Sequence, residues 1–408
     1  MISRHTTDAR PSSQASARAA IIGCMLAGMC TFLNVYDTQP LLPYLQRLYN
    51  TSAVAVSLTV SSTILAVALT APFVGLLAES IGRKNVIVPS LFAITVPTLL
   101  AATSQNLRQL IFWRFMQGLF VPGVIVVIIA YIGEEFAGGN LGKVMSSYIS
   151  GTVLGGFLGR YVSGLIAHHH DWRRAFLTIG LINLTGAFAV RATLPPARNF
   201  VRAPNIRHSF FETLRHLRNP RMLAVFGVGF SALFAIVGAF TYVNFYLARP
   251  PFHLNSEQLG AIFAVYILGF FVTPLSGRVL DRYGTRITAV LACTFAITGL
   301  ALTMVLKLPV IILGLALFST GVFIFQAIGT VQTGVVAGRS RSSAAGLYVT
   351  FYYIGGTLGA TVTGWMWAAD GWRASVLLLM AVAVLALVLA WLSSRSIELT
   401  DAAVPVTP

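Results

Sequence analysis

Two distant segments of this chain share one pattern: residues 75–88 read GLLAESIGRKNVIV and residues 277–290 read GRVLDRYGTRITAV. Three positions match at an offset of 202 residues, so that Gly75, Glu79 and Gly82 recur as Gly277, Asp281 and Gly284. Seven identities lie at an offset of 200: Tyr148, Gly155, Gly156, Gly159, Gly164, Trp172 and Arg173 recur as Tyr348, Gly355, Gly356, Gly359, Gly364, Trp372 and Arg373. The repeat predicts two similar, parallel halves, as in transporters whose binding site lies between two halves.

The composition is that of a membrane protein. Of the 408 residues, 56% are hydrophobic and only 10% are charged, whereas soluble proteins carry about 25% charged residues. The net charge of +16 does not indicate nucleic-acid binding, because the basic residues lie in short gaps between apolar runs rather than in one patch. Cys24, Cys30 and Cys293 lie inside apolar runs, so no disulfide framework is predicted.

The apolar runs predict the domain organisation. A transmembrane helix needs roughly 20 mainly apolar residues. Twelve such runs lie at residues 19–44, 52–79, 85–104, 107–134, 142–166, 173–193, 221–247, 256–279, 285–305, 308–335, 342–367 and 373–394. We therefore predict an all-α integral membrane protein with twelve transmembrane helices in two parallel-repeat six-helix bundles. Its parts are a tail (1–18), a bundle (19–193), a linker (194–220), a second bundle (221–394) and a tail (395–408).

The basic residues predict the orientation. The two termini and the loops on their side of the membrane hold 19 Lys and Arg residues, whereas the opposite loops hold seven. Since cytoplasmic loops are enriched in Lys and Arg, we expect both termini and the linker to be cytoplasmic. This is the pattern of a multi-pass protein of the cytoplasmic, or inner, membrane.

Four motifs resemble those of the major facilitator superfamily and its twelve-span drug:proton antiporters. Residues 75–84 resemble the superfamily's loop signature, and residues 33–43, LNVYDTQPLLP, fit the first-span motif with its two prolines. Residues 110–118, LIFWRFMQG, fit the span 4 motif, and residues 151–159, GTVLGGFLG, resemble the span 5 antiporter motif. The chain departs from these motifs at Glu79, Ser80, Gly156 and Arg160, where the family has Asp, Arg, Pro and Gly.

The resemblance implies a conformational latch in the repeated loops. Its residues are Gly75, Glu79, Gly82, Arg83, Gly277, Asp281, Gly284 and Arg286. The glycines permit a tight turn and close backbone approach. The resemblance implies that Glu79 docks at the N-terminus of span 11, which carries partial positive charge, and stabilises the outward-facing state. The alternative is a solvated loop whose charges only set the orientation.

Glycines in span 5 predict close helix packing. Gly151, Gly155 and Gly159, with Gly156 beside them, have the small-residue spacing that lets membrane helices approach each other. This packing either stabilises the bundle alone or also seals one face of the transporter. The sequence leaves both interpretations open.

Asp37 is the one acid that the sequence places within a span. It lies beside a polar helical stripe formed by Thr31, Asn34 and Thr38, ahead of Pro40 and Pro43. Arg114 lies at a comparable depth in span 4. Our hypothesis is that Asp37 is the proton-coupling site and Arg114 its charge partner. The alternatives are a structural ion pair that does not titrate and an interfacial Asp in contact with water.

The remaining features of the sequence concern another charge within a span, metal binding and catalysis. Arg160 lies near the outer end of span 5, where we expect its side chain to reach the membrane interface; a role in substrate binding or gating is the alternative. Three consecutive histidines, His168 to His170, do not share one helical face, so no metal site is predicted. There is no Walker-type motif and no nucleophile triad, so no cofactor and no enzymatic activity are expected.

The expected function is transport. Candidate substrate-binding residues are the polar and aromatic residues within spans: Asn34, Gln117, Tyr242, Asn244, Tyr266, Gln326, Gln332, Tyr348 and Tyr352. Aromatics and amides favour an amphipathic substrate, so we expect proton-coupled export of drugs or toxic metabolites by a monomer embedded in membrane lipid. The alternatives are proton-coupled export or import of a sugar, amino acid or other metabolite, and a non-transporting membrane sensor.

Overall fold

The computed structural model describes residues 12–136, 140–197, 217–337 and 341–394. The chain is all-α, as predicted. The N-terminal half contains α1 (Ser12–Val35), the 3-10 helix η1 (Gln39–Leu41), α2 (Leu42–Leu48), α3 (Ala53–Ile81), α4 (Lys84–Ala101), α5 (Leu107–Phe120), α6 (Pro122–Glu135), α7 (Leu141–His169) and α8 (Trp172–Thr193). The C-terminal half contains α10 (Pro220–Leu247), α11 (Ser256–Ile262), the 3-10 helix η2 (Phe263–Ile267), α12 (Leu268–Leu302), α13 (Leu308–Ala337) and α14 (Arg341–Ser394). The predicted tails and most of the predicted linker lie outside the described residues.

Length and composition of the helices do not by themselves confirm the predicted twelve spans. Within the described ranges, nine helical segments are long and apolar enough to cross a membrane. The difference of three arises because α12 and α14 each run through a position where the sequence predicts a loop, and because α7, predicted as a span, is not among the nine. At 1.5 Å per residue, the 54 residues of α14 would extend about 80 Å, against a hydrocarbon core of about 30 Å. Both helices contain non-helical backbone, at Gly284 in α12 and at Asp370 and Gly371 in α14. The twelve-span, parallel-repeat arrangement remains a prediction.

The first span is interrupted next to its prolines. α1 ends at Val35, and η1 and α2 each have a proline in their first turn, Pro40 and Pro43. Proline is tolerated there because the first turn of a helix has no intrahelical partner for its N–H groups. The three residues between α1 and η1, Tyr36 to Thr38, belong to neither helix, and all three are buried.

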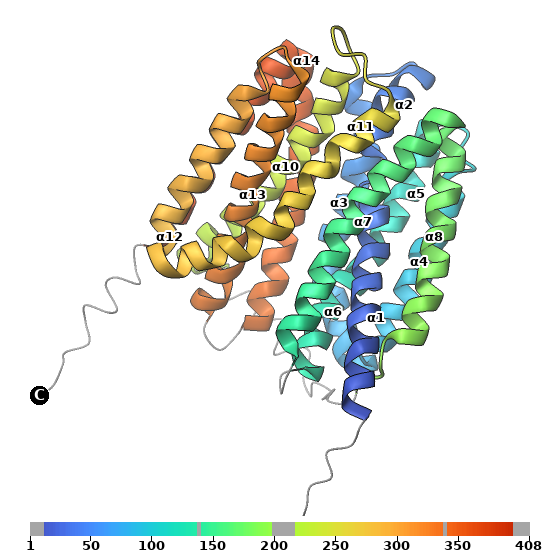
Figure 1. The fold of residues 1–408 in the computed structure, drawn as a ribbon, viewed down its shortest axis with the longest axis vertical. Coiled ribbons are helices and arrows are strands. Elements are labelled where there is room, and N and C mark those ends of the chain that lie inside the picture. Colours follow the sequence, from blue (N-terminus) through green and yellow to red (C-terminus); the bar gives the residue numbers. More distant parts are fainter. Residues whose placement is uncertain (1–11, 137–139, 198–216, 338–340, 395–408) are drawn as a thin grey trace, which may run out of the picture.

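Two helix pairs at the centre of the bundle pack through glycines (Figure 1). A Cβ at Gly151, Gly155 or Gly159 of α7 would lie 2.0, 2.1 or 2.2 Å from the backbone oxygens of Met25, Met29 or Leu33 in α1. A Cβ at Gly355 or Gly359 of α14 would lie 2.1 or 2.3 Å from the oxygens of Phe230 or Phe234 in α10. These distances leave no room for a side chain, so the two halves use the same small-residue contact.

Gly156 does not share this packing role. A Cβ there would meet the side chain of Arg160 at 3.3 Å and not the backbone of α1. Its predicted place in the helix contact was wrong, because one residue along a helix turns the position by about 100° away from the packed face.

The two halves are joined at the end of the bundle where α2 and α11 lie, opposite the start of α1 (Figure 1). We call this the α11 end. His169 of α7 pairs with Glu257 of α11 at 3.3 Å. The Tyr242 hydroxyl of α10 donates to Ser57 of α3 at 3.0 Å, and the Gln39 amide donates to Thr241 at 3.2 Å. The interface at this end is therefore partly polar, the kind of contact that can break and re-form.

Candidate functional site

The structure brings Asp37 and Arg114 together. Asp37 lies in the interruption between α1 and η1, Arg114 lies in α5, and Oδ1 is 2.8 Å from Nη1. The side chains are 1% and 0% exposed, which is not the burial of an interfacial carboxylate in contact with water. Thr38 donates its hydroxyl to Oδ1 at 3.2 Å. The second carboxylate oxygen, Oδ2, is buried and has no hydrogen-bond partner among the described residues.

Arg114 is held mainly by the C-terminal end of α1. Its Nη1 donates to the backbone oxygen of Asn34 at 2.9 Å, and its Nη2 donates to the backbone oxygen of Val35 at 2.8 Å. These carbonyls are available because the helix ends there, and the negative end of a helix dipole favours a cation. Nε donates to the Thr59 oxygen of α3 at 3.1 Å. Arg114 therefore keeps three backbone acceptors apart from its ion pair with Asp37.

Asn34 and Gln117, both predicted to bind substrate, belong to a network around this arginine. The Gln117 oxygen accepts from Arg114, and its amide donates to Asn34 Oδ1 at 3.1 Å and to Thr98 at 2.7 Å. Asn34 donates to Asn183 Oδ1 of α8 at 2.9 Å, and Asn183 donates to Thr95 at 2.8 Å. Since protein groups already satisfy both amides, the network positions Arg114 in this state.

Three members of that network were missed by sequence reasoning: Thr95, Thr98 and Asn183. A signal was present, because Asn183 is the only amide in its apolar span and the two threonines lie three residues apart in α4. Only the fold shows that Thr98 and Asn183 contact Asn34, and that Thr95 contacts Asn183.

Arg160 does not reach the membrane interface, and that prediction was wrong. The residue is 2% exposed, because its helix face points at the contact between the halves. Its Nε donates to Gln39 Oε1 at 2.7 Å and its Nη1 donates to the Gly156 oxygen at 2.6 Å. The guanidinium carbon lies 4.6, 4.4 and 4.9 Å from the ring centres of Tyr36, Phe263 and Tyr266. Phe263 and Tyr266 belong to η2, in the other half.

The remaining predicted substrate residues do not form one cluster with each other, and each makes contacts of its own. The single Tyr242 O–H has two acceptors within reach, Ser57 Oγ and the Ala360 backbone oxygen at 2.9 Å, and Asn244 donates to the Phe240 backbone oxygen at 2.5 Å. Tyr348 stacks on Tyr352 with ring centres 6.1 Å apart, and its hydroxyl lies 3.4 Å from the Gln326 oxygen. Gln332 donates to Thr285 at 2.6 Å. Of this group, Tyr266 alone contacts a buried cation through its ring.

The repeated loops have the backbone geometry that requires glycine. Gly82 has a φ of 96° and Gly284 a φ of 73°, a region that L side chains rarely adopt. The expected close backbone approach at Gly75 and Gly277 was wrong for this state. A Cβ would meet only Val126 at 3.9 Å at the first position and nothing within 4 Å at the second.

The charged loop residues contact nearby helix ends. Arg83 makes two hydrogen bonds to the Glu134 carboxylate of α6, at 2.6 and 3.1 Å. Arg286 donates to Ser394 at 3.3 Å, and Asp281 is exposed. The side chain of Glu79 lies outside what the structure describes, so its docking near span 11 remains a prediction.

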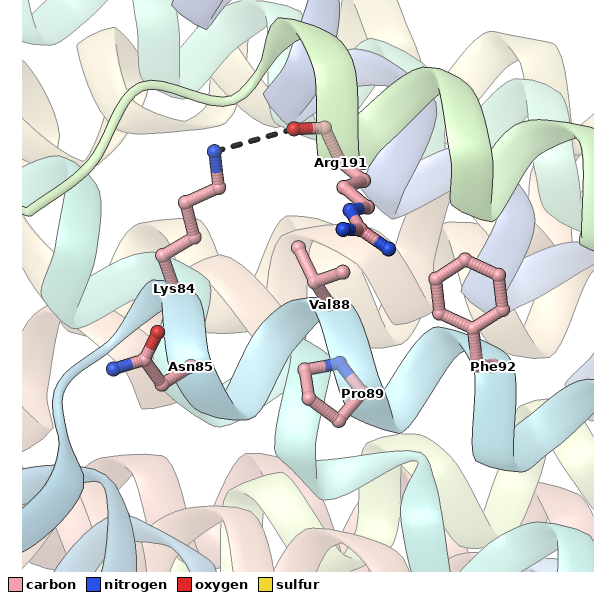
Figure 2. Close-up of a pocket in the computed structure, with 6 residues that line it drawn as sticks. All are labelled: Lys84, Asn85, Val88, Pro89, Phe92 and Arg191. Atoms are coloured by element: carbon pink, nitrogen blue, oxygen red, sulfur yellow. Dashed lines mark hydrogen bonds between the residues drawn. The ribbon is translucent and has the colours of Figure 1, made fainter.

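A groove of about 600 Å³ lies between α4 and α8, at the end of the bundle where α1 begins (Figure 2). Its lining residues are Lys84, Asn85, Val88, Pro89, Phe92 and Arg191. Lys84 donates to the backbone oxygens of Arg191 and Leu194. None of the predicted site residues lines this groove, which is separate from the Asp37 network.

Comparison with known proteins gives one consistent result. The sequence model of the Major Facilitator Superfamily matches residues 24–360 and 251–402. The chain is 34% identical to the MFS-type transporter YybF of Bacillus subtilis, over 92% of this chain and 93% of YybF. It is 30% identical to the inner membrane transport protein YnfM of Escherichia coli, over 88% of this chain and 87% of YnfM. A solved bacterial homolog of the human lysosomal transporter Spinster, inward-facing and unoccupied, has the same fold, with a TM-score of 0.79, 15% identity, and coverage of 95% of this chain and 99% of that one.

Proposed function

Because this chain belongs to the Major Facilitator Superfamily, we propose that it is a proton-coupled exporter of small amphipathic molecules, with Asp37 as its proton site. Family membership and the apolar helices make it a multi-pass membrane transporter. The direction of transport, the proton coupling and the substrate class are the proposal. We place both termini in the cytoplasm, from the distribution of Lys and Arg.

The observation that carries the proposal is that only one of the two carboxylate oxygens of Asp37 has a partner among the described residues. A charged side chain within a membrane span is costly, and such residues mark proton and substrate pathways by default. Here Oδ1 is paired with Arg114, whereas Oδ2 is buried without a partner in the described part of the chain. Because no donor stabilises the negative charge at Oδ2 and burial disfavours the charged form, protonation of Asp37 is favoured.

Protonation of Asp37 has a direct route to the contact between the halves. When Asp37 is neutral, Arg114 loses its ion pair but keeps the oxygens of Asn34, Val35 and Thr59. Two residues after Asp37, Gln39 accepts from Arg160 and donates to Thr241 of the C-terminal half. A shift of the backbone at Asp37 therefore acts on contacts that join the two halves.

The state of the molecule fits one step of alternating access. The contacts described above join the halves at the α11 end, and with cytoplasmic termini that end is the outer one. We therefore propose that the structure is a state in which the outer side is closed. In this scheme, the proton exchange at Asp37 accompanies the opening of the α11 end.

The test uses inside-out membrane vesicles in which respiration drives a proton gradient. Addition of a transported compound should release protons through the antiporter and reduce the gradient, measured with a pH-sensitive acridine dye. A panel of amphipathic cations, neutral compounds and acids is applied to the wild type, Asp37→Asn and the control Asp171→Asn. Asp171 is a partly exposed cap of α8, which accepts from the Arg174 amide at 2.8 Å.

We expect Asp37→Asn to lose substrate-dependent proton release and Asp171→Asn to keep it. Undiminished coupling in Asp37→Asn would overturn the assignment of the proton site. Proton flux of the opposite sign would indicate import, one of the alternatives. If no compound moves protons in either direction while the protein still binds compounds, a sensor becomes the better interpretation.

A further inference from the structure

Arg160 is a buried cation for which the proton site gives no role. A guanidinium has five N–H donors. The Nε donor bonds to Gln39 and one Nη1 donor bonds to the Gly156 oxygen, whereas Nη2 has no acceptor among the described residues. None of the ion pairs within the described ranges involves Arg160. Two hydrogen bonds and three aromatic rings are therefore its direct contacts among the described residues.

This environment does not fully replace water around the charge. Removing a guanidinium from water is costly, and cation–π contacts compensate for only part of that cost. Buried charges in proteins are normally paired with an opposite charge. Asp37 is the nearby acid, but its carboxylate is paired with Arg114. The structure therefore contains one buried cation more than it contains buried anions in this region.

The guanidinium lies at the contact between the two halves. Gln39 and Tyr36 approach it from the N-terminal half, and Phe263 and Tyr266 approach it from η2 of the C-terminal half. The site is also adjacent to the proton site, since Ser163, less than one turn further along α7, donates to the Asp37 backbone oxygen at 2.5 Å. A molecule bound to Arg160 would therefore contact both halves and lie next to Asp37.

We propose that the free N–H donors of Arg160, two on Nη2 and one on Nη1, bind the carboxylate of the transported molecule, and that the rings of Tyr36, Phe263 and Tyr266 pack against its apolar body. Guanidinium donors form strong, charge-assisted hydrogen bonds to a carboxylate. Aromatic rings supply the apolar lining typical of small-molecule sites. The substrate is thus a small organic acid with an aromatic or aliphatic body.

The charge count restricts this class to monoanions. Arg114 and Arg160 are the two fully buried arginines of this region, and Arg114 is already neutralised by Asp37. A second negative charge on the ligand would remain unpaired in a buried site. This inference rests on the proposed function and narrows its amphipathic substrate to monocarboxylates.

The first measurement needs no variant. Purified protein in detergent is titrated with phenylacetate and with phenylacetamide, which has nearly the same shape but no charge, and binding is measured by calorimetry at neutral pH. Hexanoate and hexanamide form a second pair. We expect each acid to bind at least about tenfold more tightly than its amide, the difference that charge-assisted hydrogen bonds produce. Equal affinities of acid and amide in both pairs would overturn the proposal.

The second measurement assigns the preference to Arg160. In Arg160→Gln, the affinity for phenylacetate should fall about 10- to 100-fold while phenylacetamide is unaffected, and Arg160→Lys should recover part of the loss. The matched control is Arg249→Gln, which removes an exposed arginine whose guanidinium carbon lies 4.9 Å from the Trp367 ring centre. Equal loss in both variants would indicate general charge attraction and overturn the proposal. Size-exclusion chromatography and thermal unfolding of Arg160→Gln and Arg160→Lys check that the fold is retained.

The binding measurements at Arg160 and the vesicle assay of proton release at Asp37 can succeed or fail independently. If acids bind through Arg160 but move no protons through Asp37, the proposed coupling fails and the binding site stands. If amphipathic cations release protons through Asp37 and acids bind no better than their amides, the coupling stands and the binding site fails.

Discussion

Asp37 and Arg114 form a buried ion pair of 2.8 Å in which the guanidinium contacts only one oxygen of the carboxylate. The asymmetry has a structural cause. The guanidinium of Arg114 is directed at the end of α1, where the oxygens of Asn34 and Val35 accept two of its donors. One carboxylate oxygen is thereby left for a proton. The pair is thus better arranged for exchange than a symmetric, two-bond pair.

Arg114→Gln is expected to destabilise the protein by about 3–5 kcal/mol, because it leaves the Asp37 carboxylate buried and unpaired. The double variant with Asp37→Asn should recover much of that loss, since no charge then remains at the pair. Thermal unfolding of both single variants and the double variant in detergent gives the coupling. Additive losses would show that the two side chains do not stabilise each other.

Gly155→Ala is expected to lower stability by about 1–3 kcal/mol, since its Cβ would lie 2.1 Å from the Met29 oxygen. Gly355→Ala should behave in the same way, because its Cβ would lie 2.1 Å from the Phe230 oxygen. The matched control is Gly142→Ala in the same helix as Gly155, where a Cβ meets nothing within 4 Å. The control should be neutral or slightly stabilising. Equal unfolding temperatures for Gly155→Ala and the control would contradict the packing described here.

Gly82→Ala and Gly284→Ala should each cost about 1–3 kcal/mol, because their φ angles of 96° and 73° are strained for alanine. Gly277→Ala should cost much less, since it lies in helical backbone with open space at its Cβ position. The three unfolding temperatures test whether the repeated loop needs glycine for its turn or for close approach. If Gly277→Ala has the largest effect, close approach matters in another state of the cycle.

A cross-link between the halves at the α11 end should stop transport. The side-chain ends of His169 and Glu257 lie 3.3 Å apart, so cysteines at these two positions should be joined by a bifunctional methanethiosulfonate reagent whose spacer replaces the lost side-chain length. Transport should be lost on cross-linking and restored by a reductant, because the α11 end must open in alternating access. Each single-cysteine variant is a control, and the described cysteines Cys24, Cys30 and Cys293 are buried. Unchanged transport in the cross-linked pair would show that this contact need not break.

The sequence was sufficient for features that depend on local chemistry. The apolar composition predicted an all-α membrane protein, and the repeated loop motif predicted the superfamily that the comparisons support. Asp37 was also identified from sequence, because an acid inside an apolar span is recognisable wherever it points. Glycine at positions 82 and 284 was likewise predicted to form a turn, since positive φ is a local property of the backbone.

Only the tertiary structure decided which side chains meet. Arg160 was expected at the membrane interface because the sequence gives its position along a helix. It does not show which other helix packs against that side of α7. The fold places η2 of the other half against that face, so the arginine is buried among three rings. The Asn183–Asn34 contact spans 149 residues in the sequence, and no local pattern encodes such a distance. The residue types and their positions along the predicted helices thus follow from sequence, whereas the partners of Asp37 and Arg160 follow from how the helices pack.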